Sequence, residues 1–307
     1  MKRARIIVGA RGSMLSVAQT GLVIRALHRI CPGREFILET IKTMGDRVKQ
    51  WGRNDTGIFV KEIEDALREK KIDIAVHSVK DLPSKLPRGL CLAAVTRRQD
   101  PRDVLISRNG YSIFSLPRSA CVGTSSLRRQ AQILHIRPDL KVIGLRGNLD
   151  TRIRKLHARE YDAIIVAAAG LRRLGITGVR VRPVPVELAL PQSGQGALGI
   201  EARANDAFVK RLVSALDDPV SHACVDAERA FLRESNAGCR MPVAAFARVS
   251  GRRMILEGMV ISLDGRDMVR LRASAPVRDG QKLGRRLARQ VLRYGGAKIL
   301  KEIRNGA

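Results

Sequence analysis

The chain has 307 residues and a net charge of +28, and aromatic residues make up only 3% of it. This length is sufficient for two or three domains with cores of their own. No apolar run approaches the roughly 18 residues of a membrane span, and the run that stops at Arg11 is too short for a signal peptide, so we expect no membrane partner.

The chain has five cysteines, which are scattered along it: Cys31, Cys91, Cys121, Cys224 and Cys239. An odd number without a Cys-x-x-Cys pair argues against a disulfide framework or a metal site, and favours a reducing cytoplasm. The positive charge is spread evenly along the chain. Such a surface can bind nucleic acid loosely, but few aromatic side chains are available to stack on bases, so we expect no specific nucleic-acid partner.

The first hundred residues alternate between predicted strands and helices. Apolar runs rich in β-branched residues predict strands at Arg5–Gly9, Glu35–Ile41, Ile72–Val76 and Gly89–Val95. Helical spacing predicts helices over Met14–Ile30 and Ile58–Lys71. In the first helix, we expect the following apolar side chains to face the core: Leu15, Ala18, Leu22, Ala26 and Ile30.

The polar run Arg97–Asp103 is interpreted as a crossing between domains, after which the alternation restarts. Strands are predicted at Val104–Ser107, Ala120–Gly123, Lys141–Gly144 and Asp162–Ala168, and helices at Ser126–Ile136 and Leu149–Arg159. Strands that alternate with helices are typical of parallel sheets covered on both faces. The repeated alternation indicates two similar lobes rather than one large sheet.

The last part of the chain follows a different pattern. Pro183–Pro191 is proline-rich and is interpreted as a second crossing, so Leu198–Ala202 is predicted to return to the first lobe. Then follow a predicted helix, three strands and a basic helix: Val220–Ser235, Val243–Val249, Met254–Ser262, Met268–Ala275 and a segment from Gly280. We therefore predict an α/β fold with two lobes, 1–97 with 197–216 and 102–191, and a small C-terminal α+β domain, 219–307.

Polar residues directly follow the predicted strand Ile72–Val76, namely His77, Ser78, Lys80 and Asp81. Open α/β sheets bind their ligands beyond the carboxyl ends of strands, so these residues are candidates for a site. The alternative is a solvated turn, as for most Lys–Asp neighbours. Pro83 disfavours helix before it, so Leu82 is expected to be extended.

Three hydroxyl residues follow a second predicted strand and open a helix: Thr124, Ser125 and Ser126. Free N–H groups and hydroxyls at a helix start favour an anion. Arg128 and Arg129 oppose the helix dipole there, which suggests that a negative ligand holds them. Plain capping with solvated arginines is an equal alternative.

More arginines follow strand ends, namely Arg11 with the nearby Ser13, Arg146, Arg152 and Arg173. One such arginine means little. Several at the same end of the sheets predict a cleft lined with guanidinium forks, which suit carboxylates.

Cys239 lies between Gly238 and Arg240 in a predicted loop. An ordinary loop thiol is the simpler interpretation. A reactive thiol needs a positive field, which Arg240 could provide.

Ten segments resemble, in order and over nearly the whole chain, the porphobilinogen deaminase family, whose members are also called hydroxymethylbilane synthases. The ten segments are the following: Arg11-Gly-Ser13, Thr43-Met-Gly-Asp46, Phe59-Val-Lys-Glu62, His77–Pro83, Asp100-Pro-Arg-Asp103, Gly123–Gln130, Leu145-Arg-Gly-Asn148, Ala169–Arg173, Leu190–Ala197 and Gly238-Cys239.

The resemblance implies two lobes like those of periplasmic binding proteins and a third domain whose cysteine, here Cys239, carries a dipyrromethane cofactor through a thioether bond. Four porphobilinogen units are joined to this cofactor, each with loss of ammonia, and water releases the product as hydroxymethylbilane. Members of the family usually act as monomers.

The resemblance also implies roles for individual residues. Each pyrrole ring carries an acetate and a propionate, so the growing chain is a polyanion. The cofactor is expected to be held by Lys80, Asp81, Thr124, Ser125, Ser126, Arg128 and Arg129. The incoming and growing rings are expected to be held by Arg11, Ser13, Arg146, Arg152 and Arg173. Asp81 is the predicted catalytic residue, because its carboxylate can accept pyrrole N–H bonds and stabilise the cation left when ammonia departs.

Three other functions are considered from the residues themselves. The first is a two-lobed receptor for an anion, against which the missing signal peptide and the third domain argue. The second is a thiol hydrolase in which Cys239 is the nucleophile and His77 the base. The third, binding of nucleic acid, rests on charge alone.

Overall fold

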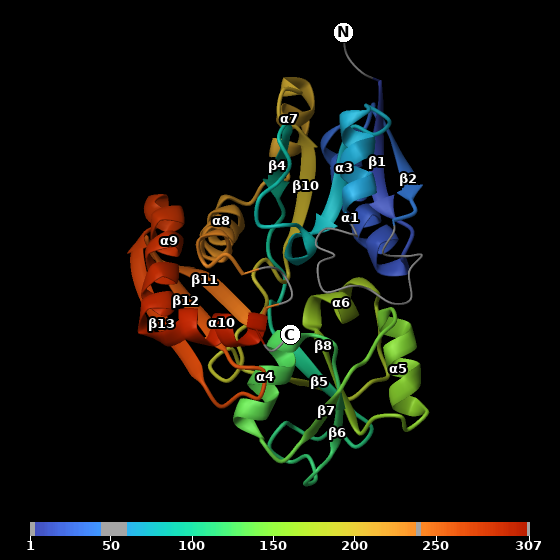
Figure 1. The fold of residues 1–307 in the computed structure, drawn as a ribbon. Helices are drawn as coiled ribbons and strands as arrows, with labels where there is room; N and C mark the ends of the chain where they lie inside the picture. The colour runs from blue at the N-terminus through green and yellow to red at the C-terminus, as the bar shows by residue number, and fades with distance from the viewer. Residues whose placement is uncertain (1–3, 44–59, 238–240, 306–307) are drawn as a thin grey trace. The chain divides into compact units, whose positions relative to one another are not determined.

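A computed structural model describes residues 4–43, 60–237 and 241–305 of the protein (Figure 1). Contacts divide the chain into two compact units. Unit 1 comprises Met1–Gln99 and Ala197–His222, and unit 2 comprises Asp100–Gly196 and Ala223–Ala307. The predicted positions of Cys239 and of the helix start at Ile58 and Phe59 lie outside the described residues.

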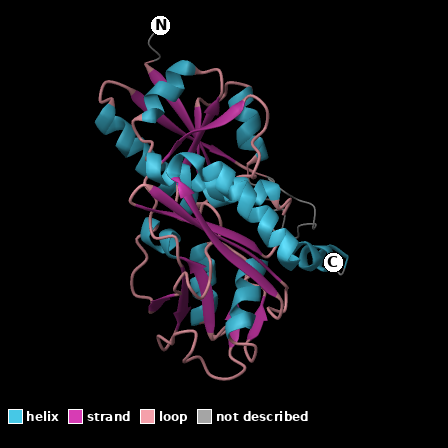
Figure 2. Cartoon of the chain, turned by 90° about the vertical axis from the view of Figure 1, so that its left-hand side faces the viewer, coloured by secondary structure: helices cyan, strands magenta, loops and turns pink. Residues whose placement is uncertain are grey.

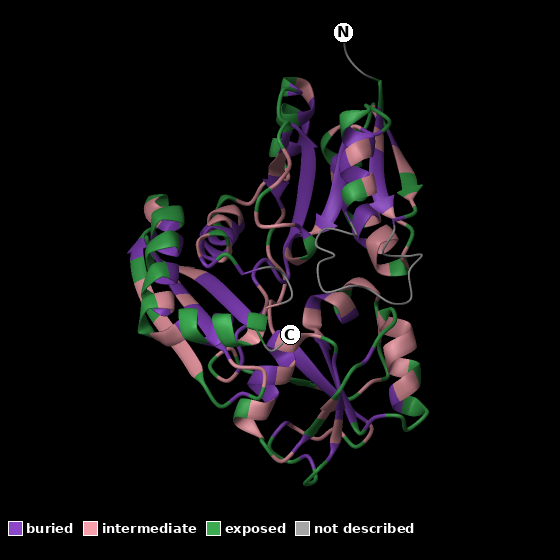
Figure 3. Cartoon of the chain, viewed as in Figure 1, coloured by how far each residue is buried: buried purple, intermediate pink, exposed green. Residues whose placement is uncertain are grey.

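Unit 1 contains a five-stranded sheet in the order β2-β1-β3-β10-β4. The strands are β1 (Arg5–Arg11), β2 (Glu35–Ile41), β3 (Ile74–Ser78), β4 (Leu90–Val95) and β10 (Leu198–Arg203). β1 pairs in parallel with β2 and β3, whereas β10 is antiparallel to β3 and β4. β10 is buried along its whole length and β3 nearly so (Figure 3).

Helices cover both faces of this first sheet (Figure 2). They are α1 (Met14–Ile30), α3 (Lys61–Arg68) and α7 (Ala207–Ser214). Val23 and Leu27 of α1 and Val209 of α7 pack on one face, and Ile63 and Leu67 of α3 pack on the other. The apolar residues of each helix recur at helical spacing, so each helix buries one stripe against the sheet.

Unit 2 contains a second five-stranded sheet, in the order β7-β6-β8-β5-β9. Its strands are β5 (Asp103–Ser107), β6 (Cys121–Gly123), β7 (Lys141–Ile143), β8 (Ala163–Ala167) and β9 (Val181–Pro183). The accompanying helices are α4 (Leu127–Ile136), α5 (Leu149–His157) and α6 (Ala168–Arg173). β6 is parallel to β7 and β8, and β5 is antiparallel to β8 and β9.

The two sheets have the same topology: three parallel strands, then an antiparallel strand, then an edge strand. The prediction of two similar α/β lobes is therefore confirmed, but the expectation of parallel sheets is wrong for one strand in each. β5 and β10 both follow a crossing segment instead of the helix of a βαβ unit. Without that right-handed crossover nothing requires these strands to be parallel to their neighbours.

The C-terminal part of unit 2 is an α+β layer, which confirms that part of the predicted fold. Its three-stranded sheet is antiparallel in the order β11-β12-β13. The elements are α8 (Pro219–Glu234, which begins in unit 1), β11 (Val243–Ser250), β12 (Arg253–Ile261), β13 (Met268–Pro276), α9 (Gly280–Val291) and α10 (Ala297–Asn305). Phe231 of α8 packs so closely on Gly258 that a Cβ there would lie 2.2 Å from its ring.

The predicted inward face of α1 is wrong, because none of its five residues is among the buried residues of the helix, and Leu22 and Ile30 are 36% and 43% exposed. Gln19 and Thr20 are buried instead. Gln19 Oε1 accepts a hydrogen bond from Ser78 Oγ at 3.1 Å, so a satisfied polar group occupies the buried stripe. Apolar spacing alone cannot identify a face that contains such residues.

Candidate active site

The neighbours Lys80 and Asp81 lie on a single 3₁₀ turn, Val79–Asp81, directly after β3. Val79 and Leu82 are buried on either side of them, whereas Asp81 is exposed and Lys80 half-buried. The Val79 N–H donates a hydrogen bond to the carbonyl of Ala197 at 3.1 Å. The turn is thus anchored by its apolar residues and presents its charged ones.

Gly199 of β10 allows the turn to pack closely. A Cβ at this position would lie 2.6 Å from Leu92 Cδ1 and 3.1 Å from Val79 Cγ2. Glycine in a strand interior commonly marks such a close approach. Leu82 has ψ 141° and is extended, as predicted for the residue before Pro83.

Arg11 and Ser13 lie at the same edge of the first sheet as this turn. Arg11 is the last residue of β1, and Ser13 caps α1 by accepting a hydrogen bond from the Ser16 N–H at 3.3 Å. The Arg11 N–H in turn donates to Ser16 Oγ at 3.1 Å. Because β1 and β3 are parallel neighbours, unit 1 brings Arg11, Ser13, Lys80 and Asp81 to one carboxyl edge.

In unit 2, the three predicted hydroxyl residues form the connection between β6 and α4. Thr124 is buried, and its Oγ1 accepts a hydrogen bond from the Ser126 N–H at 3.2 Å. Ser125 Oγ donates to the Leu145 carbonyl at 2.9 Å. Two of the hydroxyls therefore hold the shape of the turn, while Ser126 is the N-cap residue of α4 without a side-chain capping bond.

Arg128 and Arg129, in the first turn of α4, are 4% and 7% exposed. Both bind the carboxylate of Asp103 through an Nη2 atom, each at 2.7 Å. The sequence predicts a negative partner for these arginines, and the structure provides one within the chain. Asp103 reaches this edge because β5 is antiparallel, so its first residue lies opposite Ala167 at the end of β8.

This buried cluster has more positive than negative charge. Burial raises the pKa of Asp103, but the charges of Arg128 and Arg129 outweigh it and hold that pKa well below its usual range. Gln195 Nε2 also donates to Asp103 Oδ1 at 2.8 Å. The Nε atoms of Arg128 and Arg129 are buried without a hydrogen-bond partner in the described part of the chain.

Three further predicted arginines lie at this edge of the second sheet. Arg146 follows β7 and is exposed, and Arg173 ends α6 and donates from Nη2 to the Gly196 carbonyl at 2.6 Å. Arg152 donates from Nε to the Gly147 carbonyl at 2.8 Å. Burial, and then the charge of nearby Arg129, lower the pKa of Arg152. A cation in such a place is stabilised by a bound anion.

Sequence reasoning missed Asp103 and Gln195 as members of the arginine cluster, and it also missed a buried acidic group in unit 1. His77 Nε2 and Glu201 Oε2 lie 3.0 Å apart, an ion-pair distance, without hydrogen-bond alignment. Burial, and then the charge of Glu201, raise the pKa of neighbouring Glu64 to about 7. His77 is 5% exposed, so it is not a general base at the surface of unit 1.

Two family models match almost the whole chain. Residues 6–211 match the dipyromethane cofactor binding domain of porphobilinogen deaminase, and residues 222–293 match its C-terminal domain. The chain belongs to the porphobilinogen deaminase family. Porphobilinogen deaminase of Moorella thermoacetica is 47% identical over 97% of this chain and 96% of the relative. That of Desulforudis audaxviator is 46% identical over 99% of this chain and 100% of the relative.

Solved structures that this chain resembles at low identity include solute-binding proteins. The periplasmic aliphatic sulphonate binding protein of Escherichia coli is 13% identical, with a TM-score of 0.42, over 76% of this chain and 71% of that chain. A substrate binding domain of a putative amino acid transporter from Streptococcus pneumoniae is 11% identical, with a TM-score of 0.45, over 70% and 92%.

The residues of unit 2 fit the carboxylates of the family's dipyrromethane cofactor. Five guanidinium groups lie at the carboxyl edge of the second sheet. Two of them, those of Arg128 and Arg129, share the carboxylate of Asp103, and their buried Nε donors have no hydrogen-bond acceptor among the described residues. A ligand with several carboxylates would satisfy both the charge and the donors. In residues 4–43, 60–237 and 241–305, no cluster of three or more His, Cys, Asp or Glu could hold a metal ion. In the same ranges, no helix has both the length and the apolar character needed to cross a membrane.

Proposed function

We propose that this chain is a transferase that deaminates four porphobilinogen molecules and joins them head to tail on a covalently bound dipyrromethane, from which hydroxymethylbilane is released. The observation that carries this proposal is the 46–47% identity to porphobilinogen deaminases over nearly the full length of both chains. The positive edge of the second sheet supports it independently, because substrate, cofactor and product are all polycarboxylates.

In this proposal Cys239 holds the dipyrromethane through a thioether bond. The bound group supplies the pyrrole to which the first porphobilinogen is joined. Carboxylates of the cofactor are held by Lys80, Thr124, Ser125, Ser126, Arg128 and Arg129, and those of the incoming and growing rings by Arg11, Ser13, Arg146, Arg152 and Arg173. Guanidinium groups suit this task because they stay charged and present paired donors to a carboxylate.

Asp81 is the proposed catalytic residue. It is exposed on a turn whose flanking residues Val79 and Leu82 are buried, so its carboxylate is presented from a firmly packed position. There it can accept the pyrrole N–H bonds of the substrate and stabilise the positive charge that develops as ammonia departs. It can also take the proton that the new carbon–carbon bond releases from the pyrrole. Such acid–base assistance contributes on the order of 10²–10⁴ in rate.

The proposal also covers the domain organisation, the cellular compartment and the oligomeric state of the protein. The two similar sheets and the C-terminal layer support two lobes, 1–97 with 197–216 and 102–191, and a third domain, 219–307. Four cysteines of the described residues are free thiols, which favours a reducing cytoplasm. A monomer is the proposed state, because members of the family usually act alone.

The intact mass of the purified protein, with peptide mapping around Cys239, tests the proposal. We expect an excess equal to two linked pyrrole units on the peptide that contains Cys239. Adding porphobilinogen should then produce further steps of one pyrrole unit. An unmodified mass would call for incubation of the protein with porphobilinogen, and a Cys239 that still stayed unmodified would exclude this function in favour of an anion-binding protein.

A further inference from the structure

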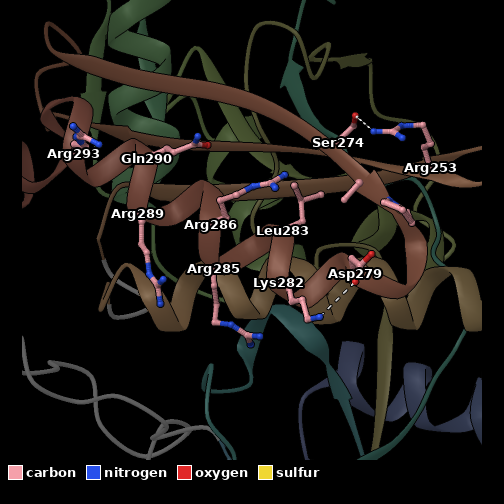
Figure 4. A pocket seen from close by; sticks show the side chains of 12 residues that line it. Arg253, Ser274, Asp279, Lys282, Leu283, Arg285, Arg286, Arg289, Gln290 and Arg293 are labelled. Atoms are coloured by element: carbon pink, nitrogen blue, oxygen red, sulfur yellow. Dashed lines mark hydrogen bonds and ion pairs between the residues drawn. The ribbon is translucent and has the colours of Figure 1, made fainter.

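A basic groove lies beside α9 in the C-terminal part of unit 2, with a volume of about 690 Å³ (Figure 4). Its cations come from α9, the residues after it and the start of β12: Arg253, Lys282, Arg285, Arg286, Arg289 and Arg293. Asp279 is the single acid among its twelve lining residues. At the mean charge of the chain, +28 over 307 residues, twelve residues would carry a net charge of about +1. The groove is therefore several times more basic than the rest of the protein.

The amphipathic pattern of α9 explains why these cations are exposed. Leu283, Leu287 and Val291 are buried in the core against the third sheet. The opposite face of the helix carries the exposed Arg285 and Arg286. One stripe of the helix thus stabilises the domain, and the other is available to a ligand.

Few acids compensate the charge of this groove. Lys282 Nζ lies 3.8 Å from Asp279, and Arg289 Nε lies 2.7 Å from Glu234 on α8. Arg285, Arg286 and Arg293 have no ion pair with any residue in 4–43, 60–237 or 241–305. These three positively charged guanidinium groups repel one another, and an anion bound between them would offset this repulsion.

The length of the groove favours a chain of anions over a single one. Lys282 and Arg293 are eleven residues apart on a helical path, which corresponds to about 16 Å. One carboxylate or phosphate cannot contact cations over this distance. A nucleic-acid strand, which advances by about 3.4 Å per nucleotide, would place roughly five phosphates along it. Arginine forks match phosphate oxygens in geometry.

An exposed aromatic side chain follows the last groove residue in the sequence. Tyr294 comes directly after Arg293 and is 70% exposed, and the helix is distorted at Leu292–Gly296, where Gly295 has φ 116°. An exposed ring beside a basic groove is a platform on which a base can stack. A membrane surface is a poorer match, since the apolar side chains of α9 are all buried in the protein core and none can insert.

We propose that this groove binds single-stranded nucleic acid through its phosphates, without sequence preference. The inference goes beyond the proposed enzymatic function, because none of the groove residues belongs to the candidate active site. With a single aromatic platform, the phosphate contacts dominate the binding. The affinity should therefore fall steeply as salt rises.

Fluorescence anisotropy of the purified full chain with labelled oligodeoxythymidylate of about 20 nucleotides tests the proposal. Contacts to the roughly five phosphates along the groove predict a slope of about −3.5 for log affinity against log salt. In the triple variant Arg285→Gln, Arg286→Gln and Arg293→Gln, we expect an affinity loss of at least about tenfold and a slope shallower by about 2. The matched control removes three exposed arginines of unit 1: Arg25→Gln, Arg29→Gln and Arg88→Gln. Both variants should join porphobilinogen at the unaltered rate.

Three outcomes would overturn the proposal. If the unit 1 control weakens binding as much as the groove variant, diffuse charge and not the groove binds the oligonucleotide. If the oligonucleotide fails to bind at low salt, the groove is not a nucleic-acid site. If vesicles rich in phosphatidylserine bind in a groove-dependent manner and the oligonucleotide does not, the partner is a lipid surface. None of these results bears on the pyrrole adduct at Cys239, so the two proposals fail separately.

Discussion

The two five-stranded sheets place a buried carboxylate on equivalent strands but surround it differently. In the second sheet, Asp103 on β5 binds the guanidinium groups of Arg128 and Arg129. In the first sheet, Glu201 on β10 lies against His77 and near a second acid, Glu64. With the same topology, Asp103 thus lies beside two arginines, whereas Glu201 lies beside a histidine and a second carboxylate.

This difference shows that topology positions a side chain while its neighbours determine its chemistry. The arginines lower the pKa of Asp103 in spite of burial, so Asp103 acts as an internal counter-ion. In the acidic group of the first sheet, burial and the charge of Glu201 raise the pKa of Glu64, and the charges of His77 and Arg68 do not outweigh them. A third carboxylate, Asp81, is exposed and therefore free to act on a ligand.

Replacing Asp81 gives the largest expected effect on activity. Asp81→Ala should lower the rate of porphobilinogen consumption by about 10²–10⁴-fold, because the cation that develops on the substrate loses the carboxylate of Asp81 that stabilises it. Its stability should not change, because Asp81 is exposed. Steady-state assay and thermal unfolding measure the two properties, and Asp65→Ala on α3 serves as the control with full activity. Near-normal turnover by Asp81→Ala would refute the catalytic role.

Replacing Asp103 should have the opposite outcome, a loss of stability. Asp103→Asn leaves two buried guanidinium groups without a counter-charge, which typically costs about 3–5 kcal/mol. Urea denaturation of the protein measures this loss.

A matched control is Asp139→Asn. Asp139 accepts two hydrogen bonds from Arg137, each at 2.7 Å, and these bonds hold its pKa near 2. This pair is partly exposed, so its removal should cost much less stability than the loss of the buried Asp103. Equal losses in the two variants would mean that Asp103 is not a special counter-ion.

Local patterns were sufficient to predict much of the fold. The helix Met14–Ile30 and the strand Glu35–Ile41 have the predicted bounds. Apolar residues at helical spacing and a run of β-branched residues are local signals, so a short stretch of sequence is enough to identify them. The extended conformation of Leu82 follows from its proline neighbour alone. Short elements such as β9 and α7 were not predicted, since they carry too few residues to show a period.

The missed features all depend on contacts distant in sequence. Arg128 and Asp103 are 25 residues apart, and they meet only because β5 runs antiparallel to β8. The sequence placed Asp103 in a polar crossing and the arginines at a helix start, and nothing local links the two. Gln19 is buried for the same kind of reason, since its partner is Ser78.

The smallest predicted effect is on the pH dependence of stability. It tests the buried acids of the first sheet, Glu64 and Glu201. The pKa of Glu64 is about 7 in the folded protein against 4.5 as the ordinary value. The folded state therefore binds a proton more tightly than the unfolded state, so this contribution to stability is complete below pH 4.5 and is lost as the pH rises to about 7. At 1.36 kcal/mol per pKa unit the whole loss is on the order of 3 kcal/mol, most of it reached by pH 7.

Glu64→Gln cannot ionise and should escape that loss. The free energy of unfolding of the variant relative to the original protein should rise by about 2–3 kcal/mol between pH 4.5 and 7, and should stay level above pH 7. Urea denaturation across this range measures the difference, with Glu69→Gln at the exposed end of α3 as a control that should show no such rise. A flat difference for Glu64→Gln would mean that His77 compensates the acidic pair as fully as arginine compensates Asp103. The two sheets would then differ in the residues that neutralise their buried carboxylates but not in the energetic result.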